Sequence, residues 1–188
     1  MRKRLFPIKA FSQAFLISFE HRFFHLGLDA LHEKAFQFFL RGKQLATLQS
    51  EVKQFLADEF YQFFYFPALS RLRRAQHEGH HTLILSSSPS FIVGPIAHYL
   101  DVALWRSSEY TTGEDGRFKQ VGSVLSGEEK GRYLKAFAKA HHIPANEVVA
   151  YSDSPLDLPF LMAAGKAVVA NPSRYMKKIC RKKNWEII

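Results

Sequence analysis

The sequence predicts an α/β fold, in which a parallel sheet carries helices on both faces, preceded by a helical subdomain. From residue 67 onward, short apolar runs alternate with amphipathic segments, the pattern of strands alternating with helices. Before residue 67, apolar residues recur at helical spacing without strand alternation. With 188 residues, 47% of them hydrophobic, the chain can bury one sizeable core. We therefore expect a helical subdomain over residues 1–66 and an α/β core over residues 67–188.

Aromatic residues dominate the expected helical subdomain, and breaks are expected near Gly27 and Gly42. Their three- and four-residue spacing favours a packed core over a ligand-binding surface, although part of the stripe could line a substrate entrance. The stripe comprises Phe11, Phe15, Phe19, Ala35, Phe38, Phe39, Val52, Phe55, Leu56, Phe60 and Phe63.

The α/β core is expected to alternate strands and helices, interrupted by one hairpin around the Gly-Glu-Asp-Gly turn at 113–116. Pro67 suits the first turn of a helix, and Gly79 and Gly165 suit helix ends. The expected elements are a helix over 67–78, a strand over 81–85, a turn over 86–89, a helix over 91–100, a strand over 102–105, a hairpin over 110–124, a helix over 128–142, a strand over 148–151, a helix over 156–164 and a strand over 167–170.

Polar side chains follow two of these strands where each strand ends. Ser86 and Ser87 follow the strand over 81–85, and Asp153 and Asp157 follow the strand over 148–151. Ligands of parallel sheets bind outside the carboxyl ends of the strands. We therefore expect these four residues to converge on one crevice, which Lys130, near the start of its helix, could also reach.

Asp153 is the best candidate for a metal ligand. Mg²⁺ takes oxygen ligands and is usually held by one or two carboxylates, with water and substrate phosphate completing its shell. Asp157 lies one helical turn further on, close enough to support Asp153 or to pair with a lysine. The alternative is that Asp153 or Ser154 simply caps the helix beginning near Pro155.

Ser86 and the amides after it could bind a phosphoryl group, because a strand-to-helix turn presents N–H donors. Lys130 could neutralise charge on such a group. Alternatively, the serines before Pro89 form only a polar turn, and the Lys130 side chain faces solvent. A Ser-His-Asp hydrolase is disfavoured because no G-x-S-x-G motif surrounds the serines. Two groups of histidines are not spaced like zinc ligands, and we assign them no chemical role. They are His77, His80 and His81, and His141 and His142.

The formal net charge is +9, much of it in the C-terminal segment. Such a surplus could attract phosphorylated substrates, anionic lipids or nucleic acid, but a solvated helix face is favoured. The lone Cys180 suggests a reducing compartment, and we expect a cytoplasmic protein. No apolar run reaches the length needed to span a bilayer, and the interrupted N-terminal stretch argues against a signal peptide. The C-terminal cations are Arg174, Lys177, Lys178, Arg181, Lys182 and Lys183.

Three motifs, in this order, resemble a known family: LILSSSPSFIVGPIA (83–97), GEEKGRYL (127–134) and YSDSPLDLPFLMAAGKAVVANP (151–172). They are similar to the second, third and fourth motifs of the haloacid dehalogenase-like hydrolases, in the phosphoserine-phosphatase-like branch. The resemblance implies a Rossmann-like core over 67–188 and, more loosely, a helical cap over 1–66.

The resemblance also implies roles for the candidate residues. Ser86, with the Ser87 amide, would bind phosphoryl oxygens, and Lys130 would steady the nucleophile and the transferring group. Asp153 would hold Mg²⁺, and Asp157 would help to position the lysine. The family reaction runs through an aspartyl-phosphate, which would make this sequence that of a Mg²⁺-dependent phosphomonoester hydrolase.

One family motif is absent. The nucleophilic and acid/base aspartates belong to an Asp-x-Asp-x-Thr motif ending a central first strand, and no such motif occurs in these 188 residues. Asp29, the earliest aspartate, stands alone in a helical context. A sheet without its central strand would leave backbone groups unpaired. We therefore expect that the chain is shortened at its N-terminus, with Met1 just after the missing strand, and that it has little activity as given.

The sequence is compatible with several substrates and with functions other than hydrolysis. Leu156 stands where phosphoserine phosphatases usually carry asparagine, which argues against phosphoserine. A phosphorylated small molecule, or a phospholipid-like ester with peripheral membrane contact, suits the aromatic cap and the basic C-terminus. The main alternative is a non-catalytic relic that binds phosphate or another anion. Nucleic acid is disfavoured as a partner, and its binding would be salt-sensitive.

Overall fold

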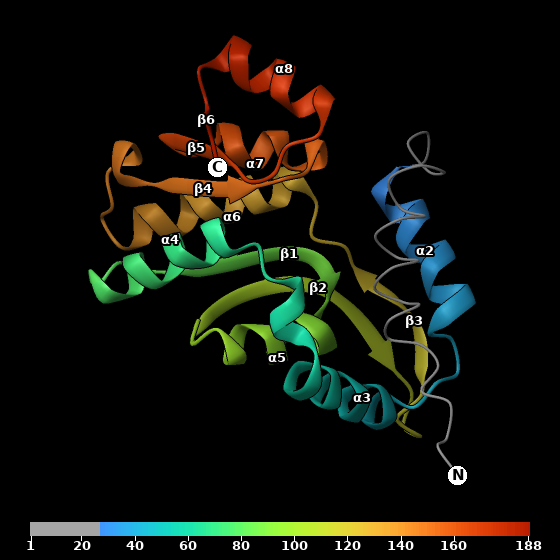
Figure 1. The fold of residues 1–188 in the computed structure, drawn as a ribbon. Helices are drawn as coiled ribbons and strands as arrows, with labels where there is room; N and C mark the ends of the chain where they lie inside the picture. Colours follow the sequence, from blue (N-terminus) through green and yellow to red (C-terminus); the bar gives the residue numbers. More distant parts are fainter. Residues whose placement is uncertain (1–26) are drawn as a thin grey trace. The chain divides into compact units, whose positions relative to one another are not determined.

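The computed structural model describes residues 27–188, and Figure 1 shows their helices and strands. They belong to two compact units, each described by itself below. Of the described residues, the first unit joins 27–63 to Ser86–Val124, and the second joins Phe64–Leu85 to Leu125–Ile188. The predicted stripe residues Phe11, Phe15 and Phe19 lie outside the described residues.

Two helices of the first unit follow the predicted breaks. Helix α2 (Leu28–Phe39) begins directly after Gly27, and Gly42, with a φ of 72°, lies in the turn before α3 (Leu45–Asp58). A short 3₁₀ helix, η1 (Phe60–Phe63), follows α3. Only glycine adopts such a φ without strain, so the turn at Gly42 separates the helices.

Only part of the expected stripe contributes to the core of this unit, since Val52 and Leu56 are buried whereas Phe39 and Phe63 are 40% and 44% exposed. The buried cluster joins the two helices to α5 (Ser90–Tyr99) and to the sheet, and Phe55 and Phe60 pack against it. Phe38, by contrast, is 81% exposed, so not every stripe residue is buried. The buried members are Phe36, Leu40, Val52, Leu56, Phe91 and Phe118.

The first sheet has the strand order β1-β2-β3 and contains the predicted hairpin. Strand β2 (Leu104–Thr112) pairs antiparallel with β3 (Phe118–Ser123), which confirms a hairpin around the 113–116 turn. Gly116 has a φ of 72° there. The strand expected over 102–105 is thus the start of a longer β2.

The strand expected over 81–85 is wrong in its bounds. Strand β1 runs over Leu83–Pro89, so Ser86 and Ser87 lie inside the strand and not beyond its end. Its residues are half-buried up to Ser88. The serines can stay extended because their polar groups find partners: the Ser87 carbonyl accepts a 2.7 Å hydrogen bond from Ser108 Oγ.

The second unit contains a parallel sheet of order β4-β5-β6. Strand β4 (Val149–Ser152) pairs parallel with β5 (Lys166–Val169), and β5 pairs parallel with β6 (Glu186–Ile187). Helix α8 (Arg174–Lys183) lies on the other side of this sheet from α6 (Gly127–Ala140) in Figure 1. This arrangement confirms the predicted α/β class.

The core of the second unit forms between this sheet and its helices. Helix α7 (Leu158–Met162) contributes Leu161, which is 1% exposed, and α8 contributes the buried Met176 and Cys180. The strands contribute Ala150, Ala167 and Val169. The remaining elements are α4 (Phe66–His77), the 3₁₀ helix η2 (Ala145–Glu147) and the 3₁₀ helix η3 (Pro155–Asp157).

Two features of the second unit differ from expectation. The helix expected over 156–164 is divided into η3 and the five-residue α7, because the Ser154 side chain starts the 3₁₀ turn and Pro159 follows it. The last strand, β6, has only two residues, and its short run offered no alternation to detect. The helix expected over 128–142 corresponds closely to α6.

No helix among residues 27–188 is both long and apolar enough to cross a membrane. The division between a cap over 1–66 and a core over 67–188 stays a prediction.

Candidate active site

The turn after β4 is held by its serines. Ser154 Oγ accepts the Leu156 N–H at 3.2 Å and so starts η3, while Ser152 Oγ accepts the Ser154 N–H at 3.2 Å. Capping of the helix near Pro155 is therefore performed by Ser154, one of the two residues considered for it. Asp153 takes no part in the cap.

Lys130 and Asp157 form a buried ion pair. Lys130 Nζ donates to Asp157 Oδ1 at 2.7 Å, and the side chains are only 5% and 14% exposed. The second carboxylate oxygen, Oδ2, accepts a hydrogen bond from Ser152 Oγ at 2.8 Å. The alternative of a solvent-facing Lys130 is therefore excluded. Both Asp157 oxygens have partners, so its carboxylate fixes the ammonium in place.

The first turn of α6 determines where Lys130 lies. Ser126 and Glu129 form a capping box, in which each side chain accepts the other's backbone N–H, at 3.2 and 2.8 Å. A Cβ on Gly127 would overlap the Leu156 carbonyl oxygen, so only glycine lets the helix start approach the turn after β4 this closely. Lys130 follows one turn later and meets Asp157.

Replacing Gly127 with alanine is expected to lower the free energy of unfolding by about 2 kcal/mol, because the added methyl group must displace backbone. Urea unfolding at neutral pH measures this change. Gly27→Ala is the control, since a Cβ there meets no heavy atom within 4 Å, and its loss should stay below about 1 kcal/mol. Equal losses of unfolding free energy in the two variants would contradict the close approach of Gly127 to the Leu156 carbonyl oxygen.

Asp153 lies at the carboxyl end of β4 with an exposed side chain, and within residues 27–188 it has no hydrogen bond or ion pair. Those residues contain no cluster of three or more His, Cys, Asp or Glu side chains that could enclose a metal. The Asp153 carboxylate therefore fits a Mg²⁺ ion only as it is usually bound in phosphate sites, where one or two protein carboxylates bind the ion and water and phosphate supply the remaining ligands.

Ser86 and Ser87 belong to the first unit. Ser86 is half-buried, and its Oγ accepts the Ser88 N–H at 3.2 Å, a local bond that orients the hydroxyl. Pro89, in extended conformation, leads directly into α5. The convergence of these serines with Asp153 on one crevice stays a prediction.

Sequence reasoning missed Ser152 and Gly127. A signal for the second existed, because S-G-E-E at 126–129 matches the capping-box pattern and would have started the helix one residue earlier. No local signal marks Ser152, whose role depends on a contact with Asp157 across the turn.

The described residues combine an α/β fold with a buried lysine–aspartate pair beside the carboxyl end of β4, and sequence comparison gives the family. The model of the haloacid dehalogenase-like hydrolases matches residues 3–162. The chain belongs to this family, as the three motifs predicted.

Two curated relatives are phosphatases by name. A probable phosphatase of Mycobacterium tuberculosis is 30% identical over 148 residues, which are 78% of this chain and 51% of the relative. A histidinol-phosphatase of Neisseria meningitidis is 28% identical over 165 residues, covering 77% of this chain and 71% of the relative. The chain thus spans about half the length of the mycobacterial relative.

Solved structures share the fold at lower identity. A protein of unknown function from Bordetella pertussis superposes with a TM-score of 0.76 at 19% identity, covering 98% of this chain and 84% of its own. A substrate-bound phosphoserine phosphatase gives a TM-score of 0.61 at 15% identity, covering 78% and 69%. Both agree with the Rossmann-like core that the motifs implied.

Proposed function

We propose that this chain provides the phosphate-binding and metal-binding part of a Mg²⁺-dependent phosphomonoester hydrolase. The observation that carries the proposal is the buried Lys130–Asp157 pair beside the carboxyl end of β4, with Asp153 unpaired among the described residues and exposed at that end. A buried ammonium held by one carboxylate is a fixed cation, which stabilises developing phosphoryl charge without reorganising.

Each residue has a role in this proposal. Lys130 Nζ would contact a phosphoryl oxygen, and Asp157 would keep the ammonium oriented toward it. Ser86 Oγ and the Ser87 amide would bind other phosphoryl oxygens. Asp153 would hold Mg²⁺, which when bound would neutralise charge on the phosphate.

In this proposal the nucleophile would come from residues outside the given sequence, which contains no Asp-x-Asp-x-Thr motif. The sheets offer support for such a complementing strand. Among residues 27–188, β1 and β4 are each the terminal strand of their sheet, and β4 exposes Val149 and Tyr151 by 42% and 40%. An exposed apolar edge strand is a site for pairing with a further strand.

The substrate we propose is the phosphate monoester of a small molecule. The names of the histidinol-phosphatase and the phosphoserine phosphatase specify different phosphate esters, so these names do not select one. Leu156 is 53% exposed beside the proposed site and offers no polar group to a substrate amine or carboxylate. A phospholipid-like ester and a cytoplasmic location stay predictions.

A second candidate function is phosphate binding without turnover, which the missing Asp-x-Asp-x-Thr motif favours. Sequencing the DNA directly upstream of the Met1 codon distinguishes the hydrolase from the phosphate-binding protein. An in-frame apolar strand followed by Asp-x-Asp-x-Thr supports the hydrolase, whereas a stop codon there supports the binding protein.

Hydrolysis of p-nitrophenyl phosphate tests the proposal. We expect the 188-residue chain to show little turnover, because positioning and charge act here without a covalent nucleophile. The same chain preceded by its in-frame upstream residues should hydrolyse the ester when Mg²⁺ is present and lose this activity with a chelator. Turnover that is unaffected by the chelator would contradict the metal-dependent mechanism.

A further inference from the structure

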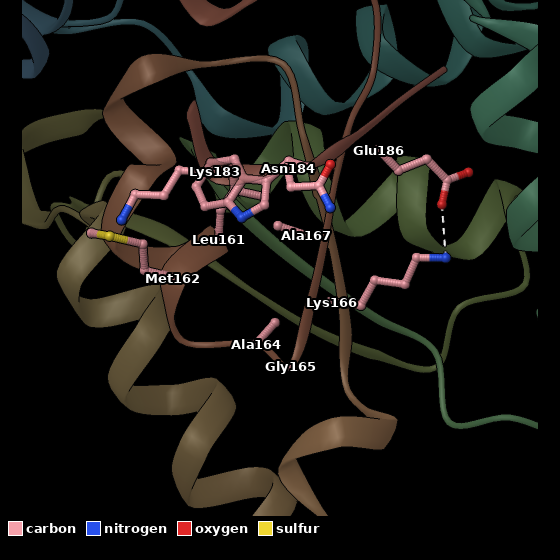
Figure 2. A pocket seen from close by; sticks show the side chains of 10 residues that line it. Leu161, Met162, Ala164, Gly165, Lys166, Ala167, Lys183, Asn184 and Glu186 are labelled. Atoms are coloured by element: carbon pink, nitrogen blue, oxygen red, sulfur yellow. Dashed lines mark ion pairs between the residues drawn. The ribbon is translucent and has the colours of Figure 1, made fainter. Parts of the chain in front are cut away.

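The second unit contains a cavity of about 560 Å³ that the proposed hydrolysis does not use (Figure 2). Its volume lies within the range of small-molecule sites, about 300–1,000 Å³. The walls come from the end of α7, the start of β5, and the segment joining α8 to β6. We infer that this cavity binds an organic anion with a flat apolar body, of the aryl carboxylate or aryl sulfonate class.

The cavity lies at the opposite edge of the sheet from the candidate active site. Its residues Lys166 and Ala167 begin β5, and Glu186 begins β6, whereas Asp153 follows the carboxyl end of β4. The three strands are parallel, so their amino ends share one edge and their carboxyl ends share the other. A four-residue strand separates these edges by about 10 Å, so one small ligand cannot occupy both.

The apolar part of the ligand would meet mainly Trp185 and the 55% exposed Met162, next to lining side chains that the core holds rigid. Leu161 and Ala167, which line the cavity, are 1% and 5% exposed, so core packing fixes them. Trp185 also lines the cavity while packing against the buried cluster of this unit. A fixed indole beside small apolar side chains favours a planar body, because flat rings bury much area against it at little entropic cost.

The anionic part is selected by Lys183. Its side chain extends along the cavity toward Met162 in Figure 2, and within the described part of the chain it has no ion pair or hydrogen bond. On the other side, Lys166 Nζ is held in an ion pair with Glu186 at 2.7 Å. Glu186 also accepts from Arg71 at 2.6 Å, and the hydrogen bond from Lys166 is the main reason why the pKa of its carboxyl lies below the usual range. Lys183 therefore remains as the cation available to a ligand.

The surroundings strengthen this preference for an anion. Asn184, in left-handed conformation with a φ of 53°, ends α8 and turns the chain so that Lys183 and Trp185 both line the cavity. Five further cations of α8 are exposed and, among residues 27–188, unpaired, which raises the local positive potential. They are Arg174, Lys177, Lys178, Arg181 and Lys182.

Calorimetric titration with naphthalene-2-sulfonate, which a phosphatase cannot hydrolyse, tests the inference. We expect saturable binding of one probe per chain, and Lys183→Met should weaken it about tenfold, because one charge-assisted contact is lost. Lys182→Met is the matched control: it removes the neighbouring charge on α8 without lining the cavity, and should weaken binding less than about twofold.

Three results would overturn the inference: no saturable binding, equal weakening by Lys183→Met and Lys182→Met, or equal affinity for the uncharged naphthalene-2-methanol. Absence of saturable binding would show that the cavity is not a binding site for the probe. Equal weakening by the two variants would mean that the probe is attracted by the overall positive charge of α8 and not by Lys183. Equal affinity for the uncharged alcohol would mean that the sulfonate group does not contribute to binding. Inorganic phosphate with Mg²⁺ should not displace the probe, and displacement would place the probe at the other edge of the sheet.

Discussion

Replacing Lys130 with methionine is expected to lower the free energy of unfolding by about 3 kcal/mol. The substitution keeps the apolar stem but leaves the Asp157 carboxylate, 14% exposed, without its cation. Removing one partner of a buried ion pair destabilises by about 3–5 kcal/mol, because the remaining charge is buried without compensation. The lower value is expected here because the Ser152 hydroxyl still donates to Asp157.

Urea unfolding at neutral pH measures this loss. Arg132→Met is the control on the same helix, because the Arg132 side chain is 76% exposed and lies 3.8 Å from Glu129, and its loss should be below about 1 kcal/mol. Combining Lys130→Met with Asp157→Leu should restore part of the stability, since the uncompensated charge is then removed. If the double variant is as unstable as the sum of the single ones, the pair is not coupled.

Acidification is expected to destabilise the first unit through His32. This residue is 1% exposed, its Nδ1 lies 2.7 Å from the Tyr110 hydroxyl oxygen, and Nε2 has no hydrogen-bond partner among the described residues. Burial lowers the pKa of His32 from 6.5 to about 4. The folded protein therefore keeps the imidazole neutral at pH values where the unfolded chain protonates it.

The sign of the effect follows from proton binding. Between pH 6.5 and about 4 the unfolded state binds more protons than the native state, so stability is complete above pH 6.5 and falls as the pH falls toward 4. At about 1.4 kcal/mol per pKa unit, the loss attributable to His32 is about 3 kcal/mol.

Urea unfolding across this pH range, with His32→Phe and the exposed His98→Gln as the matched control, measures the contribution. His32→Phe should flatten the dependence of unfolding free energy on pH, whatever its effect at neutral pH, while His98→Gln should leave the slope unchanged. A slope that His32→Phe leaves unchanged would assign the acid sensitivity to other groups.

Local patterns predicted the class of fold and most element positions. The alternation of apolar and amphipathic segments after residue 67, the glycine at 79 and the turn at 113–116 each depend on neighbours in sequence, and each has its counterpart in the structure. The end of β1 was predicted wrongly because three consecutive serines are typical of a turn. In the structure, Ser108 Oγ, 21 residues away in sequence, donates a hydrogen bond to the Ser87 carbonyl oxygen and stabilises the extended strand.

The candidate site was predicted in composition and, through the expected pairing of Asp157 with a lysine, in one contact, but not in its burial. The motifs selected Lys130, Asp153 and Asp157, yet the burial of Lys130 depends on a bond between residues 27 apart. That bond requires the close approach at Gly127, which no local pattern encodes. The cavity beside Trp185 was not predicted at all, because its walls come from three separate elements.

The p-nitrophenyl phosphate assay with Asp153→Asn tests whether Asp153 and Lys130 belong to a phosphate-hydrolysing site, as proposed above. In a chain whose upstream residues supply the proposed Asp-x-Asp-x-Thr strand, Asp153→Asn should reduce Mg²⁺-dependent turnover about 100-fold, because the proposed metal ligand loses its charge. The matched Glu147→Gln, an exposed acid at the other end of β4, should leave turnover unchanged. Asp153→Asn with undiminished Mg²⁺-dependent turnover would contradict the account.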